Sequence, residues 1–273
     1  TAQSATAVPA NTANVEYATL TGTMPAVRDI TQTGTLLDGI GMAGGDDYEK
    51  IESARLLSAS EYRLNADLGY ISLRTALQPD QVLAVAFEYT YKGENYQVGE
   101  FSTDLKDNTR SLLVKSLKNT ACTPRQGNWA LMMRNVYSLG ATDVQRERFA
   151  LDVKYLSDTT GVYLSYLPLP TMKDKRLLSV MGLDRLDNNA RRVSNGYFDF
   201  VEGYTVDAAS GRIFFPVVEP FGRHLAKEIG DTALARRFAY TELYDSTHTV
   251  AKQIAEHNKF RISGKFKATK SDE

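Results

Sequence analysis

The sequence has very little cysteine, histidine and tryptophan. Its 273 residues include one Cys, one Trp and three His. The single Cys122 cannot form an intramolecular disulfide, so a disulfide-stapled fold is excluded. The histidines at 224, 248 and 257 lack the HExxH and HxxxH spacings that zinc sites use, and no zinc centre is expected.

The chain also lacks an excess of either charge and a long hydrophobic run. There are 32 Lys and Arg against 33 Asp and Glu. Nucleic-acid binding draws on an excess of positive charge, so no nucleic-acid partner is expected. No segment approaches the ~20 apolar residues of a membrane-spanning helix, and the first residues do not resemble a signal peptide. We expect an aqueous chain whose polar ends, 1–33 and the KATKSDE tail, are cuts in a longer protein.

Tyrosine is abundant, with 15 Tyr beside 11 Phe. Tyrosine suits half-buried strands and partly wet contact surfaces, which favours β structure and an interaction role. Alternation of period two over 82–91, with turn residues at 65–69 and 92–95, predicts an antiparallel sheet of hairpins over 60–101.

Apolar residues three and four apart predict a helix over 129–139, with Asn128 as its N-cap and Gly140 as its stop. Segment 111–118 is too short to distinguish strand from helix. The other expected elements are strands at 149–155, 197–201, 204–218 and 260–266, and helices at 176–186 and within 225–258, with a break at Gly230.

This order mixes hairpins with helices and has no regular βαβ alternation, so the predicted fold class is α+β, with a helical segment near the C-terminus. We expect a linker or disordered end over 1–33, an α+β domain over 34–222, a helical segment over 223–259, and a strand start with a polar tail over 260–273. The strand at 260–266 is expected to be the first of whatever follows it.

Two hairpin patterns share a constant offset of 142 residues, one over 62–73 and the other over 204–215. In each, an Asn or Asp opens the turn and a Gly closes it. Two related subdomains, with a boundary near 157–175, or one hairpin type used twice would both explain the pattern.

Short motifs give no catalytic constellation. The loop Gly39-Ile40-Gly41-Met42-Ala43-Gly44 matches a dinucleotide pattern, but no strand is expected before it, and Asp46 and Asp47 would repel a pyrophosphate. Cys122 and the acidic turn Asp46, Asp47 and Glu49 are interpreted as structural, and Trp129 with Met132 and Met133 as core.

An oxygen-rich stretch over 184–199 lacks the spacing of a calcium-binding EF-hand. We interpret it as a polar loop, with calcium binding left open. Its residues of interest are Asp184, Asp187, Asn188, Asn189, Asn195, Gly196 and Asp199. No catalytic, cofactor-binding or metal-binding residue is assigned.

Several longer blocks are more specific. They are GDDYEKI (45–51), ARLL (54–57), EYRLNADLGYISL (61–73), VLAVAFEYTYKGENYQVGEF (82–101), NWALMMRNVYSLGA (128–141), FDFVEGYTVDAASGRIFFPVVEPFG (198–222) and ELYDSTHTVAKQ (242–253). In this order, over about residues 34–268, the chain resembles the SprA/Sov family, the outer-membrane translocon of the type IX secretion system.

The resemblance implies a fragment of a much longer, non-enzymatic protein of the cell outer membrane. That family exports folded cargo and is linked to gliding motility and to delivery of virulence factors to the cell surface. The implied partners are other parts of the same barrel, accessory outer-membrane and periplasmic subunits, and secreted cargo with a C-terminal signal domain. No cofactor is implied. Only 82–91 approaches the alternation of a membrane strand, so we expect an aqueous domain on the periplasmic or extracellular face.

Candidate contact residues are Tyr89, Tyr91 and Tyr96 of the second hairpin, and a place in the sheet core is the other interpretation. Two other functions stay open. One is a glycan-binding or adhesive cell-surface module, because aromatic-rich sheets also bind sugars. The other is a hydrolase or dinucleotide enzyme, which rests on the 39–44 loop alone and requires a helix directly after Gly44.

Overall fold

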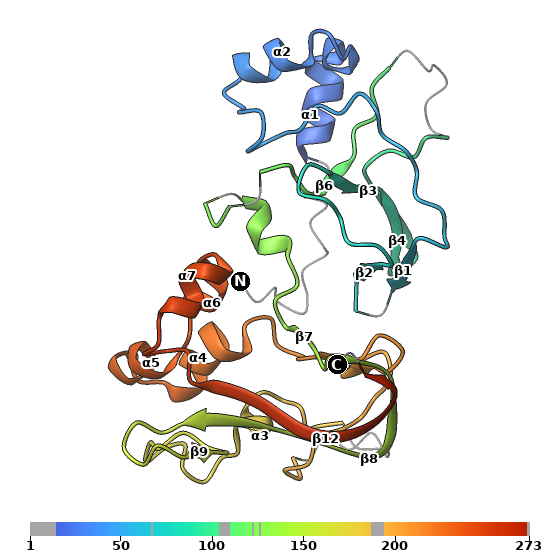
Figure 1. The fold of residues 1–273 in the computed structure, drawn as a ribbon. Coiled ribbons are helices and arrows are strands. Elements are labelled where there is room, and N and C mark those ends of the chain that lie inside the picture. The colour runs from blue at the N-terminus through green and yellow to red at the C-terminus, as the bar shows by residue number, and fades with distance from the viewer. Residues whose placement is uncertain are drawn as a thin grey trace. The chain divides into compact units, whose positions relative to one another are not determined.

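The computed structural model describes residues 15–66, 68–103, 110–121, 123–125, 127–186 and 194–271. Its fold class is α+β, with short helices and small antiparallel sheets, as predicted (Figure 1). The chain forms two compact units. The first is Thr1–Leu64 with Ile71–Met132, and the second is Asn65–Tyr70 with Met133–Glu273.

In the described residues up to Met132, the regular structure consists of short helices and paired short strands. The helices are α1 (Val15–Thr23), η2 (Pro25–Arg28), α2 (Thr33–Gly39) and η3 (Gly127–Leu131). The strand pairs are β1 (Tyr62–Asn65) with β2 (Tyr70–Leu73), β3 (Leu83–Val85) with β6 (Lys115–Lys118), and β4 (Phe87–Tyr91) with β5 (Glu94–Val98).

The hairpin around Lys92 and Gly93 is confirmed. Both residues have positive φ, 52° and 85°, which is the backbone that a two-residue hairpin turn requires. The single strand expected over 82–91 is wrong, because Ala86 separates β3 from β4 and the two strands pair with different partners. The expected sheet over 60–101 is therefore three separate pairs, and segment 111–118 supplies one of the partners.

The prediction of a linker or disordered end over 1–33 is wrong for the residues of this segment that the structure describes. Residues 15–33 form α1, η2 and the start of α2, and Val27 is fully buried. The sequence of this segment has weak periodicity, so its order comes from tertiary contacts rather than from local pattern. The remainder of the expected linker, 1–14, lies outside the described residues.

The described residues of the second unit form two three-stranded sheets, with orders β12-β8-β9 and β10-β11-β7. The strands are β7 (Val136–Ser138), β8 (Ala141–Leu156), β9 (Tyr163–Leu164), β10 (Val206–Asp207), β11 (Arg212–Phe214) and β12 (Phe260–Ser271). The helices are α3 (Leu177–Val180), η4 (Pro220–His224), α4 (Leu225–Ile229), α5 (Thr232–Phe238), α6 (Glu242–Asp245) and α7 (His248–Gln253).

A long antiparallel ribbon of β8 and β12 dominates this unit (Figure 1). The strand expected over 149–155 is confirmed within β8. The strand expected at 260–266 exists as part of β12, but it does not begin a following structure. It returns to pair with β8, with Phe260 opposite Tyr155.

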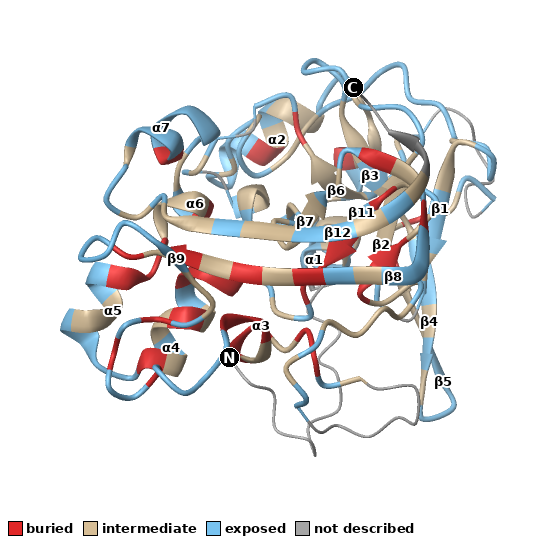
Figure 2. Cartoon of the chain, turned by 60° about the horizontal axis from the view of Figure 1, so that its bottom comes forward, coloured by how far each residue is buried: buried red, intermediate tan, exposed pale blue. Residues whose placement is uncertain are grey.

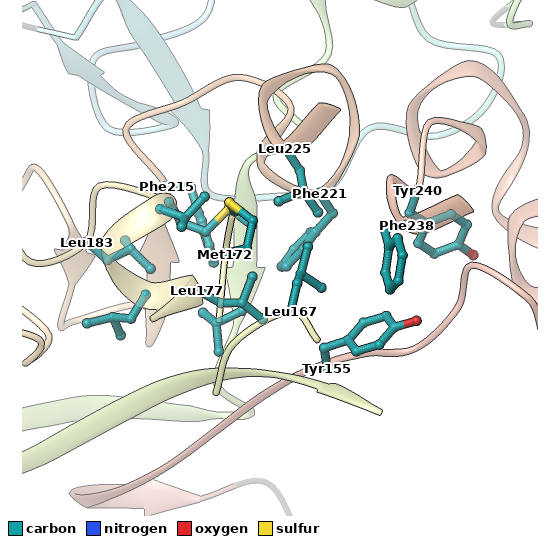
Figure 3. Packing of buried hydrophobic residues seen from close by; sticks show 14 of the residues in the cluster. Tyr155, Leu167, Met172, Leu177, Leu183, Phe215, Phe221, Leu225, Phe238 and Tyr240 are labelled. Atoms are coloured by element: carbon teal, nitrogen blue, oxygen red, sulfur yellow. The ribbon is translucent and has the colours of Figure 1, made fainter. Parts of the chain in front are cut away.

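The hydrophobic core lies in the second unit (Figures 2 and 3). On β8 the buried residues Leu151, Val153 and Tyr155 alternate with less buried neighbours, so one face of the ribbon covers the core. Other core residues come from loops, helices and strand β11. They include Leu167, Met172, Leu177, Leu183, Ile213, Phe215, Phe221, Leu225, Phe238 and Tyr240.

The helix expected over 129–139 is wrong. Only η3 is helical, and β7 follows it. The side-chain amide of Asn135 donates to the carbonyl oxygen of Phe215 at 2.7 Å, and β7 pairs with β11, so tertiary pairing overrides the helical spacing. The side-chain atoms of Asn128 are buried without a hydrogen-bond partner, so this residue is no N-cap. Gly140 turns the chain between β7 and β8 with a φ of 69°.

Other elements are shorter than expected. Helix 176–186 is only α3. The prediction of a strand over 197–201 is wrong, because no strand forms there, and within 204–218 only β10 and β11 are strands. The two echoing hairpins do share their turn chemistry. Asn65 Oδ1 accepts from the Leu68 amide at 3.0 Å and Asp207 Oδ1 from the Ser210 amide at 3.3 Å. The first turn also contains Asp67, which lies outside the described residues.

Helices fill 225–258 as expected, and Gly230, with a φ of 78°, ends α4 at the predicted break. Asp231 and Thr247 cap α5 and α7, because their side chains accept from the amides of Leu234 and Val250. These helices belong to the same core as β8, through Phe238 and other residues, and do not form a segment of their own.

Apart from Asn65–Tyr70, which belongs to the second unit, the chain divides between Met132 and Met133. The boundary considered near 157–175 is not where the chain divides, because residues on both sides of that segment share one core. Val153 precedes it and Leu177 follows it, and both are fully buried.

Candidate functional site

The three tyrosines expected as contact residues lie together on the β4–β5 hairpin. Tyr89 and Tyr96 are directly opposite, and their rings stack with centroids 5.1 Å apart. Phe87 extends this row toward Tyr89, at 6.2 Å between centroids, and is 43% exposed. The ammonium group of Lys92 lies 5.3 Å from the ring centroid of Tyr91. The hairpin therefore carries a half-buried aromatic row, which suits both sheet packing and contact with a partner.

A buried ion pair follows the hairpin, two residues after β5. Arg28 donates two hydrogen bonds to the carboxylate of Glu100, which is only 7% exposed. The same carboxylate accepts from the hydroxyl of Tyr17 and the amide of Leu113, each at 2.9 Å. Burial by itself raises the pKa of Glu100, but these donors outweigh it, and the pKa lies below its ordinary value. This cluster was not predicted, because Arg28 stands in a segment that was expected to be a linker.

The glycine loop at 39–44 does not have the geometry of a dinucleotide site. Helix α2 ends at Gly39, so a helix rather than a strand precedes the loop. Residues 45–47 form a turn, in which the Gly45 amide donates to the carbonyl oxygen of Tyr48 at 2.7 Å. No helix follows Gly44, and the dinucleotide hypothesis loses its only support.

The acidic residues beside this loop organise the backbone. Asp47 accepts from the amide of Ala43 at 2.8 Å, and Glu49 accepts from the hydroxyl of Thr120 at 2.7 Å. These contacts agree with the structural interpretation of the acidic turn. Cys122 lies outside the described residues.

In the 184–199 stretch, Asp184 is fully buried and holds the loop together. Its Oδ2 accepts from the hydroxyls of Ser179 and Ser194, each at 2.5 Å, and from the amide of Gly196 at 2.8 Å. Asp199 Oδ2 accepts from the amide of Leu186 at 2.6 Å. Residues 187–193, which include Asp187, Asn188 and Asn189, lie outside the described part of the chain. Within that part, no group of three or more His, Cys, Asp or Glu could hold a metal ion.

Two of the histidines have structural contacts. A ring nitrogen of His224 lies 2.7 Å from the carbonyl oxygen of Val180, and His257 Nδ1 lies 3.0 Å from the Glu242 carboxylate. Trp129 and Met132 lie at η3 and just after it, and Met133 is 44% exposed, so the core stripe expected for these three residues is wrong.

A hollow of 460 Å³ in the second unit was not expected from the sequence. It lies among β7, β12, the middle of β8 and helix α6. Its lining is mainly aromatic and aliphatic, and it includes Tyr137, Ser138, Phe149, Ile213, Phe221, Leu243, Phe260, Ile262, Gly264 and Phe266. The ring of Tyr137 packs edge-on against Phe215 and Phe221, with centroids 5.1 and 5.9 Å away. Burial raises the pKa of Tyr137 to about 12 and also raises that of Tyr244.

Comparison with known proteins leaves the family undetermined. No protein-family model matches the chain, and comparison with curated proteins finds no significant match. In the described residues, no helix is long and apolar enough to cross a membrane.

Proposed function

We propose that the chain is a non-catalytic structural and interaction domain of a type IX secretion translocon. In this proposal the parent protein lies in the cell outer membrane and supports protein export and gliding motility. Its partners are the barrel of the same protein, accessory outer-membrane and periplasmic subunits, and cargo with a C-terminal signal domain. The chain itself occupies the aqueous phase on one side of that membrane.

The observation that carries the proposal is the ordered set of sequence blocks that resemble this family. Two of the blocks coincide with core-forming elements. Block 198–222 covers β10, β11 and the start of η4 and contributes Ile213, Phe215 and Phe221 to the core. Block 242–253 covers α6 and α7. A resemblance that runs through packed elements supports a shared fold more strongly than one confined to exposed loops.

The contacts of buried and half-buried acidic groups also favour an interaction role over catalysis. Glu100 accepts hydrogen bonds from Arg28 and from further donors, and Asp184 accepts them from two serines and a backbone amide. Asp152 accepts from the hydroxyl of Ser165 at 2.7 Å and pairs with Arg176 at 3.2 Å. These carboxylates stabilise the fold, whereas a general acid or base must face its substrate.

The test is site-specific photo-crosslinking in the intact translocon of a bacterium that carries the full-length protein. A photoreactive residue replaces Leu56, Tyr197 or Val218, which are 87%, 75% and 70% exposed. Mass spectrometry should identify translocon subunits or signal-bearing cargo at one or more of these positions. The buried Leu167, at 0% exposure, is the matched negative control.

The result that overturns the proposal is an absence of such crosslinks at all three positions, together with normal export when this region is deleted. Titration of the chain with cell-surface polysaccharide tests the glycan-binding alternative. Saturable binding there, with export intact after the deletion, would favour an adhesive module instead.

A further inference from the structure

Strands β12 and β7 are edge strands of the second unit. The sheet orders place β12 outermost in one sheet and β7 outermost in the other. In the described part of the chain, β12 pairs only with β8 and β7 only with β11. The outer edge of such a strand presents amide and carbonyl groups that can pair with another chain.

Both edge strands border the same hollow. Its lining includes Tyr137 and Ser138 of β7 and, on β12, Ile262, Gly264 and Phe266. Its volume of 460 Å³ lies within the ~300–1,000 Å³ that is usual for ligand clefts. The hollow therefore combines strand edges that can bond a main chain with an apolar lining that can accept side chains.

The charges on β12 all have one sign. This strand carries Arg261, Lys265 and Lys267 and contains no Asp or Glu. Lys265 and Lys267 are exposed, and the register of the ribbon shifts between them. The chain as a whole has a net charge of −1, so this positive strand is a local feature.

The partner strand adds to this positive charge. Where the register shifts, β8 presents Arg146, Glu147 and Arg148, all of which are exposed. Glu147 lies 3.5 Å from the ammonium group of Lys267, in an exposed pair that contributes little stability. The ribbon surface around Lys265 and Lys267 thus has more cations than anions.

We propose that the hollow binds an extended, acidic segment of a partner protein, which adds a strand to the outer edge of β12. Its apolar side chains enter the hollow, and its carboxylates face Lys265 and Lys267. Main-chain pairing supplies affinity in this mode of recognition, and the side-chain pockets supply specificity. Lysines on an edge strand discourage indiscriminate pairing, so an acidic partner is selected over neutral or basic segments. The proposal rests on the geometry of the second unit and does not depend on the translocon function.

The experiment measures fluorescence anisotropy with the full chain and a labelled peptide of four valines alternating with four glutamates. We expect saturable binding that weakens as salt rises. A second peptide has lysine in place of glutamate, and a third is the acidic peptide with alternate amides N-methylated. Each should bind at least tenfold more weakly than the first. An acidic peptide that does not saturate, or that binds equally well when N-methylated, overturns the proposal.

Protein variants test the location of the site. The double substitution Lys265→Glu and Lys267→Glu should weaken binding of the acidic peptide at least tenfold and strengthen binding of the lysine peptide. A folding defect cannot produce that reversal. The control is Lys227→Glu with Lys252→Glu, which changes the net charge equally at exposed residues of α4 and α7. Ser138→Trp, an exposed position at the hollow, should block both peptides with an unchanged circular dichroism spectrum. Equal effects of the two charge variants would overturn the assignment to β12.

Discussion

A Cβ atom on Gly211 would lie 1.6 Å from the carbonyl oxygen of Ala141. Gly211 closes the turn between β10 and β11 with a φ of 58°, and its own carbonyl accepts from the amide of Leu139 at 2.8 Å. The β10–β11 turn therefore packs directly on the backbone where β8 begins. No side chain fits between the two segments.

The echoing hairpin provides a matched control for this contact. Gly69 occupies the corresponding turn position with a φ of 67°, but a Cβ there would meet nothing within 4 Å. Gly69→Ala should lower the free energy of unfolding by only about 1–2 kcal/mol, the penalty for an alanine in the left-handed backbone conformation. Gly211→Ala adds the clash with Ala141, which we expect to cost about 1–3 kcal/mol more. Urea unfolding followed by circular dichroism measures both, and equal costs would contradict the close approach.

Glu100 should make the first unit sensitive to acid. Its pKa in the folded protein is lowered from an ordinary value of 4.5, despite its burial, by donors that include Arg28. The stability that it contributes is therefore fully present above pH 4.5 and is lost as the pH falls through the folded pKa. Glu100→Gln should cost about 1.5–3 kcal/mol at pH 7, because it weakens hydrogen bonds to a charged group.

The single Trp129, in the first unit, gives a fluorescence signal for this unfolding. The measurement compares urea midpoints from pH 7 to pH 3. The difference between wild type and Glu100→Gln should shrink toward the acid end. A difference that stays constant with pH would show that the carboxylate charge is not involved.

Tyr137 should produce the opposite dependence in the second unit. Burial raises its pKa from 10.0 to about 12. Its contribution to stability is fully present below pH 10 and is lost as the pH rises toward 12, by at most about 3 kcal/mol. Tyr137→Phe keeps the ring packed on Phe215 and Phe221 and removes the ionisable group.

We therefore expect the stability of Tyr137→Phe to fall less steeply than that of wild type between pH 10 and pH 12. Ultraviolet absorbance at alkaline pH counts the tyrosinates directly. Burial also raises the pKa of Tyr244, so part of the loss of stability at alkaline pH should remain in the variant. Identical pH profiles for the two proteins would contradict a raised pKa of Tyr137 in the folded protein.

Local pattern predicted the elements whose signals are local. The turn at Lys92 and Gly93 needs positive φ at two successive residues, and the break at Gly230 needs it at one. Residues that suit such turns can be recognised in the sequence. The alternation in β8 was visible because one face of the ribbon is buried. By contrast, the stretch from Trp129 to Leu139 has helical spacing, and only its pairing with β11 shows that part of it is a strand.

The parts of the candidate sites that the sequence did not predict depend on contacts between residues far apart in the chain. Arg28 and Glu100 are 72 positions apart, and β8 and β12 join residues more than 100 apart, such as Tyr155 and Phe260. No periodicity or motif encodes such pairs. The hollow beside β12 was invisible for the same reason, because segment 260–266 was expected to pair with something beyond it.

The aromatic row of the β4–β5 hairpin permits a test that separates contact from folding. Tyr89 stacks on Tyr96, so Tyr89→Ala should lower stability by at least the ~0.5–1.5 kcal/mol of an aromatic pair. Tyr91 has only the exposed Lys92 over its ring among the ring contacts described, and Tyr91→Ala should forfeit about 0.5–1 kcal/mol of cation–π attraction.

If the hairpin contacts a translocon partner, Tyr91→Ala should reduce export of signal-bearing cargo while the domain stays folded. Tyr91→Phe should restore export, because the ring and its face for Lys92 remain. Secreted cargo is measured by immunoblot of the culture medium, and folding by circular dichroism of the purified chain. The contact role fails if Tyr91→Ala exports normally and Tyr89→Ala loses export only in proportion to its unfolded fraction, since sheet packing alone then accounts for the aromatic row.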